Sequence, residues 1–156
     1  MSSIATEIQY AVSGALAPEE LGALLHAAAG SDYSASELEK IIANSTAYVT
    51  ARECGRLVGF ARLLSDGAVI AYINNLAVHP AYQGRGIGKS LLTSLIEAAG
   101  NVRSVFLYTD TADALYQRKG FCRSEKRLYV KKRSVAGSFD AGAGNTHEAT
   151  SCGEAD

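Results

Sequence analysis

Hydrophobic residues in the first part of the chain recur every three to four positions, which predicts two helices after a short strand near residues 8–12. The first helix opens at Pro18, a residue suited to the first helical turn, and ends at Gly30. The second is capped by Ser34 and Glu37, whose spacing matches a capping box. The buried faces of these helices are predicted to hold Leu21, Leu24, Leu25, Ala28, Leu38, Ile41 and Ile42.

From residue 47 onward the pattern favours strands and then alternates strands with helices. The β-rich runs AYVTAREC and RLVGFARLL flank a Cys-Gly turn and predict a hairpin. The run AVIAYINNLAV, residues 68–78, is apolar on both faces, which predicts a strand at the sheet centre. A glycine-rich loop and a helix follow, then a strand over 102–109, a short helix over 111–119 and a strand run over 121–132. The predicted order is β, α, α, β, β, β, α, β, α, β, a mixed α/β fold.

Composition predicts one folded domain and a tail. The chain has 156 residues and is 47% hydrophobic, enough for one core but not for two comfortable domains. Residues 1–133 carry all 15 Lys and Arg and 12 of the 16 acids, a balance of +3, whereas residues 134–156 carry four acids and no base. We expect a single folded domain over 1–133 and a disordered acidic tail rich in Gly, Ala and Ser over 134–156. The body lacks the stripe of basic and aromatic residues typical of nucleic-acid binding.

The sequence predicts a soluble, cytoplasmic protein without a membrane segment. The opening MSSIATEIQY has no basic stretch followed by a long apolar run, and no segment approaches 18 uninterrupted apolar residues. Cys54, Cys122 and Cys152 lack metal-ligand spacing, so we expect reduced thiols and no metal. Whether the chain forms a homodimer is left open.

The loop QGRGIG, residues 83–88, has the composition of a phosphate cradle. Glycines let successive backbone N–H groups converge on one point, and the helix that begins near Gly86 adds the positive end of its dipole. A P-loop requires a glycine where this chain has Gln83, and the dinucleotide fingerprint requires one where it has Lys89. The loop therefore departs from each of these two nucleotide-binding motifs by one residue.

A third pattern fits. Gln83-x-x-Gly86-x-Gly88, entered from NNLAVHP, resembles the acyl-CoA signature of the GNAT superfamily of N-acetyltransferases, and ALYQRKGF, residues 114–121, resembles that family's tyrosine-bearing helix. The resemblance covers about residues 5–133. It implies a mixed, mostly antiparallel sheet with helices on both faces, a splayed V between two central parallel strands, and acetyl-CoA as co-substrate. The expected CoA-binding residues are Leu76, Ala77, Val78, Gln83, Gly84, Arg85, Gly86, Ile87, Gly88, Lys89 and Ser90.

The same resemblance implies roles for individual residues. The strand before the loop would bulge and splay from its neighbour at VFLYT, leaving a gap for the pantetheine arm. Leu76, Ala77 and Val78 would offer backbone groups to the pantetheine amides and one N–H to the thioester oxygen. Tyr116 matches the family's general acid, which protonates the departing thiolate.

The general base is where the chain departs from the commonest family pattern. Many relatives place Glu or Asp on the strand where this chain has Asn74 and Asn75, and neither amide accepts a proton at neutral pH. The alternatives are water held by Asn75 and backbone carbonyls, or a carboxylate from Asp32 or Asp66. His79, at the loop entrance, is expected to have a structural role.

Acceptor selection is expected to fall to the segment between the first two helices and to nearby strand ends. The candidate residues are Asp32, Tyr33, Tyr72, Asn74, Asn75 and Tyr108. Aromatic rings and one acid would suit a small cationic or aromatic amine. The sequence thus predicts an acetyl-CoA-dependent N-acetyltransferase acting on a primary amine of a small molecule, peptide or protein. The alternative is a non-catalytic acyl-CoA-binding regulatory module, which needs the loop but not Tyr116.

Overall fold

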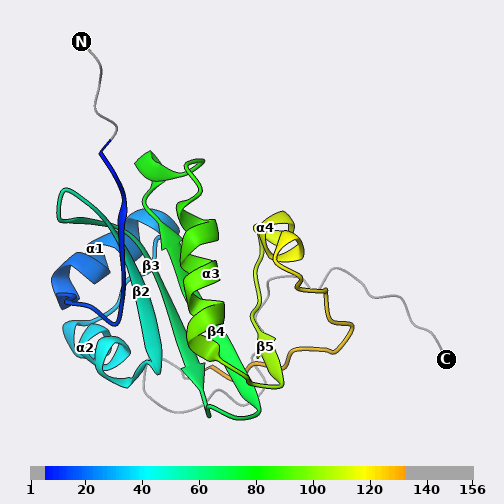
Figure 1. The fold of residues 1–156 in the computed structure, drawn as a ribbon. Helices are drawn as coiled ribbons and strands as arrows, with labels where there is room; N and C mark the ends of the chain where they lie inside the picture. Colours follow the sequence, from blue (N-terminus) through cyan, green and yellow to red (C-terminus); the bar gives the residue numbers. More distant parts are fainter. Residues whose placement is uncertain (1–5, 133–156) are drawn as a thin grey trace. The chain divides into compact units, whose positions relative to one another are not determined.

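A computed structural model describes residues 6–132, and its central element is a five-stranded sheet (Figure 1). The strands lie in the order β1-β2-β3-β4-β5. Neighbours pair antiparallel except β4 and β5, which are parallel. Their bounds are Gln9–Val12, Ala47–Glu53, Arg56–Ser65, Ile70–Val78 and Ser104–Phe106. The predicted mixed, mostly antiparallel α/β sheet is confirmed.

Helices cover both faces of the sheet, as predicted. Helices α1, Pro18–Ala29, and α2, Ala35–Asn44, pack on one face, and α3, Ile87–Ala99, packs on the other. A short 3₁₀ turn, η1, covers Pro80–Tyr82, and α4 spans Asp113–Arg118. The capping box of Ser34 and Glu37 forms as the spacing predicts, and it satisfies backbone N–H groups at the start of α2.

Two hydrophobic cores form because side chains alternate across each strand. On β2, Val49 and Ala51 face the α3 core, whereas Tyr48 faces the core beneath α1 and α2. Helix α3 contributes Leu91, Leu92 and Leu95 to its core, and all three are fully buried. The sheet is thereby packed between two layers of helices.

A β-bulge in β4 decides which side chains face which core beyond its midpoint. Arg62 pairs with Asn74 but Phe60 pairs with Ala77, so β4 carries one extra residue opposite β3. Asn75 lies in this bulge with φ 52°, a left-handed conformation that asparagine tolerates better than most residues. The bulge explains why Ile73 packs in the α3 core while Ala77 packs in the α1–α2 core.

The parallel pair diverges after a short contact. Strand β5 pairs with β4 only where Ser104–Phe106 meets residues 70–72, although β4 continues to Val78. The strand predicted over residues 102–109 is therefore three residues long. In the described part of the chain β5 is the last strand of the sheet, and β4 lies between β3 and β5.

The chain divides after Phe121 into two units. In the second unit the described residues, 122–132, contain no strand, so the strand predicted over 121–132 is wrong. A strand requires a partner edge that buries its apolar positions, and here Leu128, Tyr129 and Val130 are exposed. The predicted tail, 134–156, lies outside the described residues.

No helix among residues 6–132 is long and apolar enough to cross a membrane. The same residues contain no group of three or more His, Cys, Asp or Glu side chains placed to hold a metal ion.

Candidate active site

The glycine loop connects the end of β4 to α3 and takes a shape that glycine makes accessible. Gly84 and Gly86 have φ of 78° and 80°, values that residues with a Cβ rarely adopt. The first helical hydrogen bond of α3 runs from the Ser90 N–H to the Gly86 carbonyl, at 3.1 Å. The N–H groups of residues 87–89 therefore have no carbonyl within the helix and remain available to an anion.

Polar contacts hold the loop entrance in place. The His79 N–H donates to the Val58 carbonyl at 2.8 Å, and His79 Nδ1 accepts from the Ala81 N–H at 3.1 Å. The Gln83 side-chain amide donates to the Val78 carbonyl at 3.2 Å. These contacts agree with the structural role expected for His79.

The outer side of the loop is tied to β2 through Glu53. The Tyr82 hydroxyl donates to Glu53 at 2.7 Å, and Arg85 forms an ion pair with the same carboxylate at 3.2 Å. The Arg85 guanidinium also lies over the Tyr82 ring, 5.1 Å from its centroid. The hydrogen bond from Tyr82, together with that from Arg85, lowers the pKa of Glu53. Arg85 thus braces the loop from outside.

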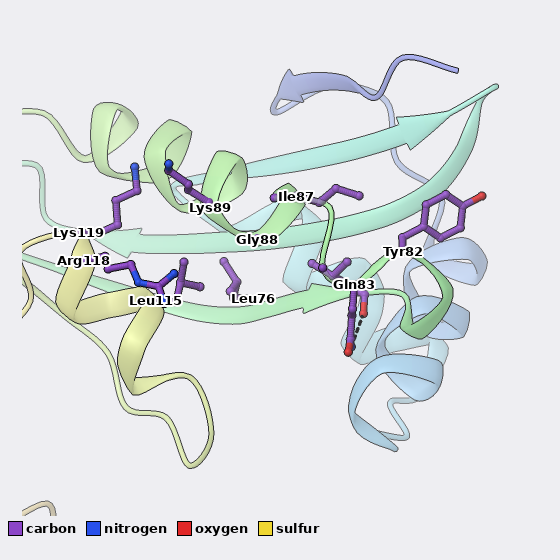
Figure 2. A pocket seen from close by; sticks show the side chains of 12 residues that line it. Leu76, Tyr82, Gln83, Ile87, Gly88, Lys89, Leu115, Arg118 and Lys119 are labelled. Atoms are coloured by element: carbon purple, nitrogen blue, oxygen red, sulfur yellow. Dashed lines mark hydrogen bonds between the residues drawn. The ribbon is translucent and has the colours of Figure 1, made fainter. Parts of the chain in front are cut away.

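A cavity of about 690 Å³ runs from this loop to α4 (Figure 2). Figure 2 shows Arg118 and Lys119 at the α4 end and Tyr82 and Gln83 at the opposite end. The walls are formed by Leu76, Val78, Tyr82, Gln83, Gly84, Gly86, Ile87, Gly88, Lys89, Leu115, Arg118 and Lys119. The cavity therefore combines orphan amides, an apolar middle and cationic side chains, which is a suitable environment for a ligand with phosphates at one end and an apolar arm.

Most of the predicted cofactor residues line this cavity, but three do not. Arg85 braces the loop, and Ser90 lies one turn into α3. Ala77 is 5% exposed and its side chain packs in the α1–α2 core, which leaves only its backbone for a ligand. Sequence reasoning missed Tyr82, Leu115, Arg118 and Lys119. The adjacent cations at the end of α4, next to Tyr116, were the available signal for the last two.

Tyr116 lies beside the cavity but is not among the residues that line it. The residue is 8% exposed, packs in the α3 core and meets Phe121 edge-on at a centroid distance of 5.9 Å. Burial raises the pKa of Tyr116 above that of an ordinary phenol. A phenol is protonated at neutral pH, and a raised pKa keeps it so. The hydroxyl makes no hydrogen bond within residues 6–132, so no protein group there competes for its proton.

A polar relay crosses the sheet face that also carries α1 and α2. The Arg62 Nε donates to Asn75 Oδ1 at 2.7 Å, and Asn75 Nδ2 donates to the Tyr33 hydroxyl at 3.3 Å. Asn74 Oδ1 accepts from the Asn75 N–H at 2.7 Å. The structure therefore brings Tyr33, Asn74 and Asn75 together, and it adds Arg62, for which the sequence offered no motif.

Aromatic residues continue this face toward β5. The Tyr72 ring lies 5.3 Å from the Phe106 ring and 5.9 Å from the Tyr108 ring, measured between centroids. Phe106 and Tyr108 are 47% and 64% exposed. Burial, together with the Tyr108 hydroxyl, raises the pKa of Tyr72. The predicted acceptor residues Tyr72 and Tyr108 are thus neighbours.

The two carboxylates considered as bases have other partners. Asp32 pairs with His26 at 2.8 Å, and its side chain is 84% exposed. Asp66 accepts from the N–H groups of Ala68, Val69 and Ile70, which lowers its pKa and stabilises the turn between β3 and β4. Both contacts are those of structural carboxylates.

Comparison with solved structures agrees with this fold. The Staphylococcus aureus protein SA2161 superposes with a TM-score of 0.74 at 28% identity, covering 81% of this chain and all of that one. An Escherichia coli GNAT family N-acetyltransferase, YhbS, solved in complex with CoA, superposes with a TM-score of 0.63 at 21% identity, covering 78% of this chain and 72% of that one. The second likeness bears on the fold alone.

Sequence comparison identifies the family. N-alpha-acetyltransferase RimI of Mycobacterium tuberculosis is 43% identical over 98 residues, which are 59% of this chain and 62% of RimI. The chloroplastic GCN5-related N-acetyltransferase 2 of Arabidopsis thaliana is 41% identical over 71 residues, 42% of this chain and 27% of that protein. The chain spans less than two thirds of the length of these relatives. A family model described as an acetyltransferase (GNAT) domain matches residues 43–123, more than half of the chain. The chain therefore belongs to the GNAT acetyltransferase family.

Proposed function

We propose that the chain transfers the acetyl group of acetyl-CoA to a primary amine by direct attack of the amine on the thioester. The observation that carries this proposal is the cavity between the glycine loop and α4 in a chain of the GNAT family. One end of this cavity presents free helix amides, and the other presents cations beside a buried, protonated tyrosine.

The pyrophosphate would bind at the loop. Gly84 and Gly86 hold the backbone in a conformation that directs amides toward one point, and α3 contributes its N-terminal dipole. Lys89, Arg118 and Lys119 add positive charge along the cavity, and the Lys119 ammonium donates to the Thr93 hydroxyl at 2.6 Å. In this proposal, backbone N–H groups position the phosphates, and the side chains supply the positive charge that balances them.

The pantetheine arm and thioester would lie along β4. After Tyr72, the backbone groups of β4 that point away from β3 have no partner on β5, because β5 pairs only with residues 70–72. The N–H and C=O groups of Leu76, Ala77 and Val78 on that side are therefore available for pantetheine amides and for the thioester oxygen. An N–H in this position would stabilise the tetrahedral oxyanion.

The proton steps balance with Tyr116 as the acid. The amine nitrogen, neutral when it attacks, forms a bond to the acetyl carbon, and collapse of the intermediate breaks the carbon–sulfur bond. The thiolate takes the proton of Tyr116, and the new amide loses its extra proton to solvent, which later restores the phenol. Because a buried phenol is a weaker acid than a thiol, this proton moves together with sulfur departure rather than after it.

Free-thiol release from acetyl-CoA, measured over a panel of primary amines, tests the proposal together with calorimetric binding of acetyl-CoA. Thiol release with at least one amine, and formation of its N-acetyl product, is the expected result. Tight binding of acetyl-CoA without turnover on any amine would instead favour an acyl-CoA-binding regulatory module. The position of Tyr116 outside the cavity lining is the feature that favours this second function.

A further inference from the structure

Arg62 is a half-buried arginine without an ion-pair partner among residues 6–132. Two other arginines that border the same sheet each have one. Arg52 pairs with Glu20 at 2.5 Å, and Arg85 pairs with Glu53 at 3.2 Å. Removing a guanidinium partly from water costs free energy unless an anion compensates it. The missing anion at Arg62 therefore calls for an explanation.

The contacts of Arg62 hold its guanidinium in one orientation and leave its ends unused. Its Nε donates to Asn75 Oδ1 at 2.7 Å, and Asn75 is held in turn by Tyr33. Neither terminal nitrogen of Arg62 has a hydrogen bond within the described residues. An arginine fixed through Nε presents its two terminal nitrogens as a fork, the arrangement that binds a carboxylate through two hydrogen bonds.

Aromatic residues share this sheet face with Arg62, and no carboxylate among residues 6–132 forms an ion pair with it. Arg62 and Tyr72 lie on the same sheet face, since Arg62 pairs with Asn74 and Leu64 pairs with Tyr72. The rings of Phe106 and Tyr108 extend this face, and both are exposed. Asp32, the acid expected in the acceptor site, forms its ion pair with His26 instead.

We propose that the acceptor is an amino-carboxylate with an aromatic or large apolar side chain, whose carboxylate binds the terminal nitrogens of Arg62. The proposal rests on the proposed function, because it specifies the acceptor of that reaction. The aromatic rings of Tyr72, Phe106 and Tyr108 contact the apolar part of the substrate. A polycationic acceptor is disfavoured, since the only charge in this residue set is positive.

Paired acceptors test this inference. Phenylalanine and phenylalaninamide differ by the carboxylate, and kcat and KM are measured for each with the full-length chain. Wild type is expected to show a KM for phenylalanine at least 10-fold lower. In Arg62→Gln, the KM for phenylalanine is expected to rise about 10- to 100-fold, while the KM for phenylalaninamide changes less than about threefold. Arg56→Gln, which removes an exposed arginine at the other end of β3, is the matched control and should behave as wild type.

Three results would overturn the inference: equal KM values for the two acceptors in wild type, an equal effect of Arg62→Gln on both, or a preference for spermidine over phenylalanine. Should Arg62→Gln fail to fold, Arg62→Lys keeps the charge but loses the fork, and the same selective rise in KM for phenylalanine is expected from it.

A binding measurement separates this inference from the proposed function. N-acetylphenylalanine and N-acetylphenylalaninamide are titrated into wild type and the Arg62 variant in the presence of CoA. Carboxylate-dependent binding that disappears in the variant supports the inference even where no amine is acetylated, and that outcome would count against the proposed catalysis alone. Equal binding of both compounds, or of neither, would overturn the inference whatever the activity.

Discussion

The cofactor half and the acceptor half of the site are built from different material. At the glycine loop, the proposed anion site consists of backbone: two glycines in the left-handed conformation and the N–H groups at the start of α3 that have no partner within the helix. On the opposite sheet face, the relay of Tyr33, Asn75 and Arg62 is made of side chains from three separate segments. A backbone site binds the part of the ligand that every acyl-CoA shares, whereas a side-chain site can change with the acceptor.

Gly86→Val is expected to abolish binding at the glycine loop, which is the cofactor half of the site. A β-branched residue at φ 80° is strained and would displace the amides that we propose to face the phosphates, so we expect calorimetry to detect no acetyl-CoA binding. Gly55→Val is the matched control, because Gly55 has the same φ of 80° in the turn between β2 and β3, away from the cavity. It should lose comparable stability, roughly 1–2 kcal/mol, and keep its affinity for acetyl-CoA. Equal affinities of the two variants would remove the phosphate assignment.

Tyr116→Phe tests the chemical step separately from the binding of cofactor and acceptor. The substitution keeps the ring that packs against Phe121 and deletes only a hydroxyl without a hydrogen bond in residues 6–132, so the melting temperature should hold. We expect kcat to fall by roughly 10²- to 10⁴-fold with acetyl-CoA affinity little changed. Stopped-flow thiol release under single-turnover conditions measures the chemical step. A folded variant with wild-type single-turnover rate would leave solvent as the proton donor.

These two positions also show how residue type and spacing led to the expected cofactor residues. A loop that requires φ near 80° favours glycine, so its conformation can be inferred from its glycines. The helix that carries Tyr116 follows this loop at the spacing typical of the family. Eight of the eleven cofactor residues expected from the resemblance line the cavity.

The sequence contains no comparable motif for the residues of the acceptor half. The Arg62 side chain donates to Asn75, which lies in the bulge of β4, and strand periodicity alone does not reveal a bulge. The sequence suggests Asp32 as an acid of the acceptor site, yet its carboxylate pairs with His26, six residues earlier in the chain. The predicted strand over 121–132 is wrong for a related reason, because β-propensity does not show whether another strand is available to pair with it.

Gly88→Ala sharpens the comparison within the loop. Gly88 is helical without a positive φ, and an added Cβ would meet Leu115, Val78 and Leu76 at ordinary contact distances of 3.8 to 3.9 Å. Alanine should therefore stabilise α3 by about 0.5–1 kcal/mol, seen as a higher melting temperature. The same Cβ occupies cavity space, so acetyl-CoA affinity should fall roughly 3- to 10-fold. Stability and binding move in opposite directions, and a joint loss of both would mean that Gly88 is required for the fold.

Tyr33→Phe should have the smallest effect, because it removes the last link of the side-chain relay and leaves Arg62 in place. The Asn75 amide donates to the Tyr33 hydroxyl at 3.3 Å, a long contact, whereas Arg62 binds Asn75 at 2.7 Å. Since Asn75 is only half-buried, water replaces the lost acceptor, and the acceptor KM is expected to rise less than about threefold with kcat unchanged.

Tyr10→Phe on β1, an exposed tyrosine, is the control for the loss of a hydroxyl and should equal wild type. Asn75→Gly, which keeps the left-handed backbone and deletes the amide, should raise the acceptor KM further than Tyr33→Phe, since it releases the orientation of the guanidinium. With phenylalanine, Asn75→Gly should raise KM more than Tyr33→Phe does. With phenylalaninamide, neither variant should change KM. A Tyr33→Phe effect as large as that of Asn75→Gly on both acceptors would show that Tyr33 contacts the substrate itself, and that the relay does not act through Arg62.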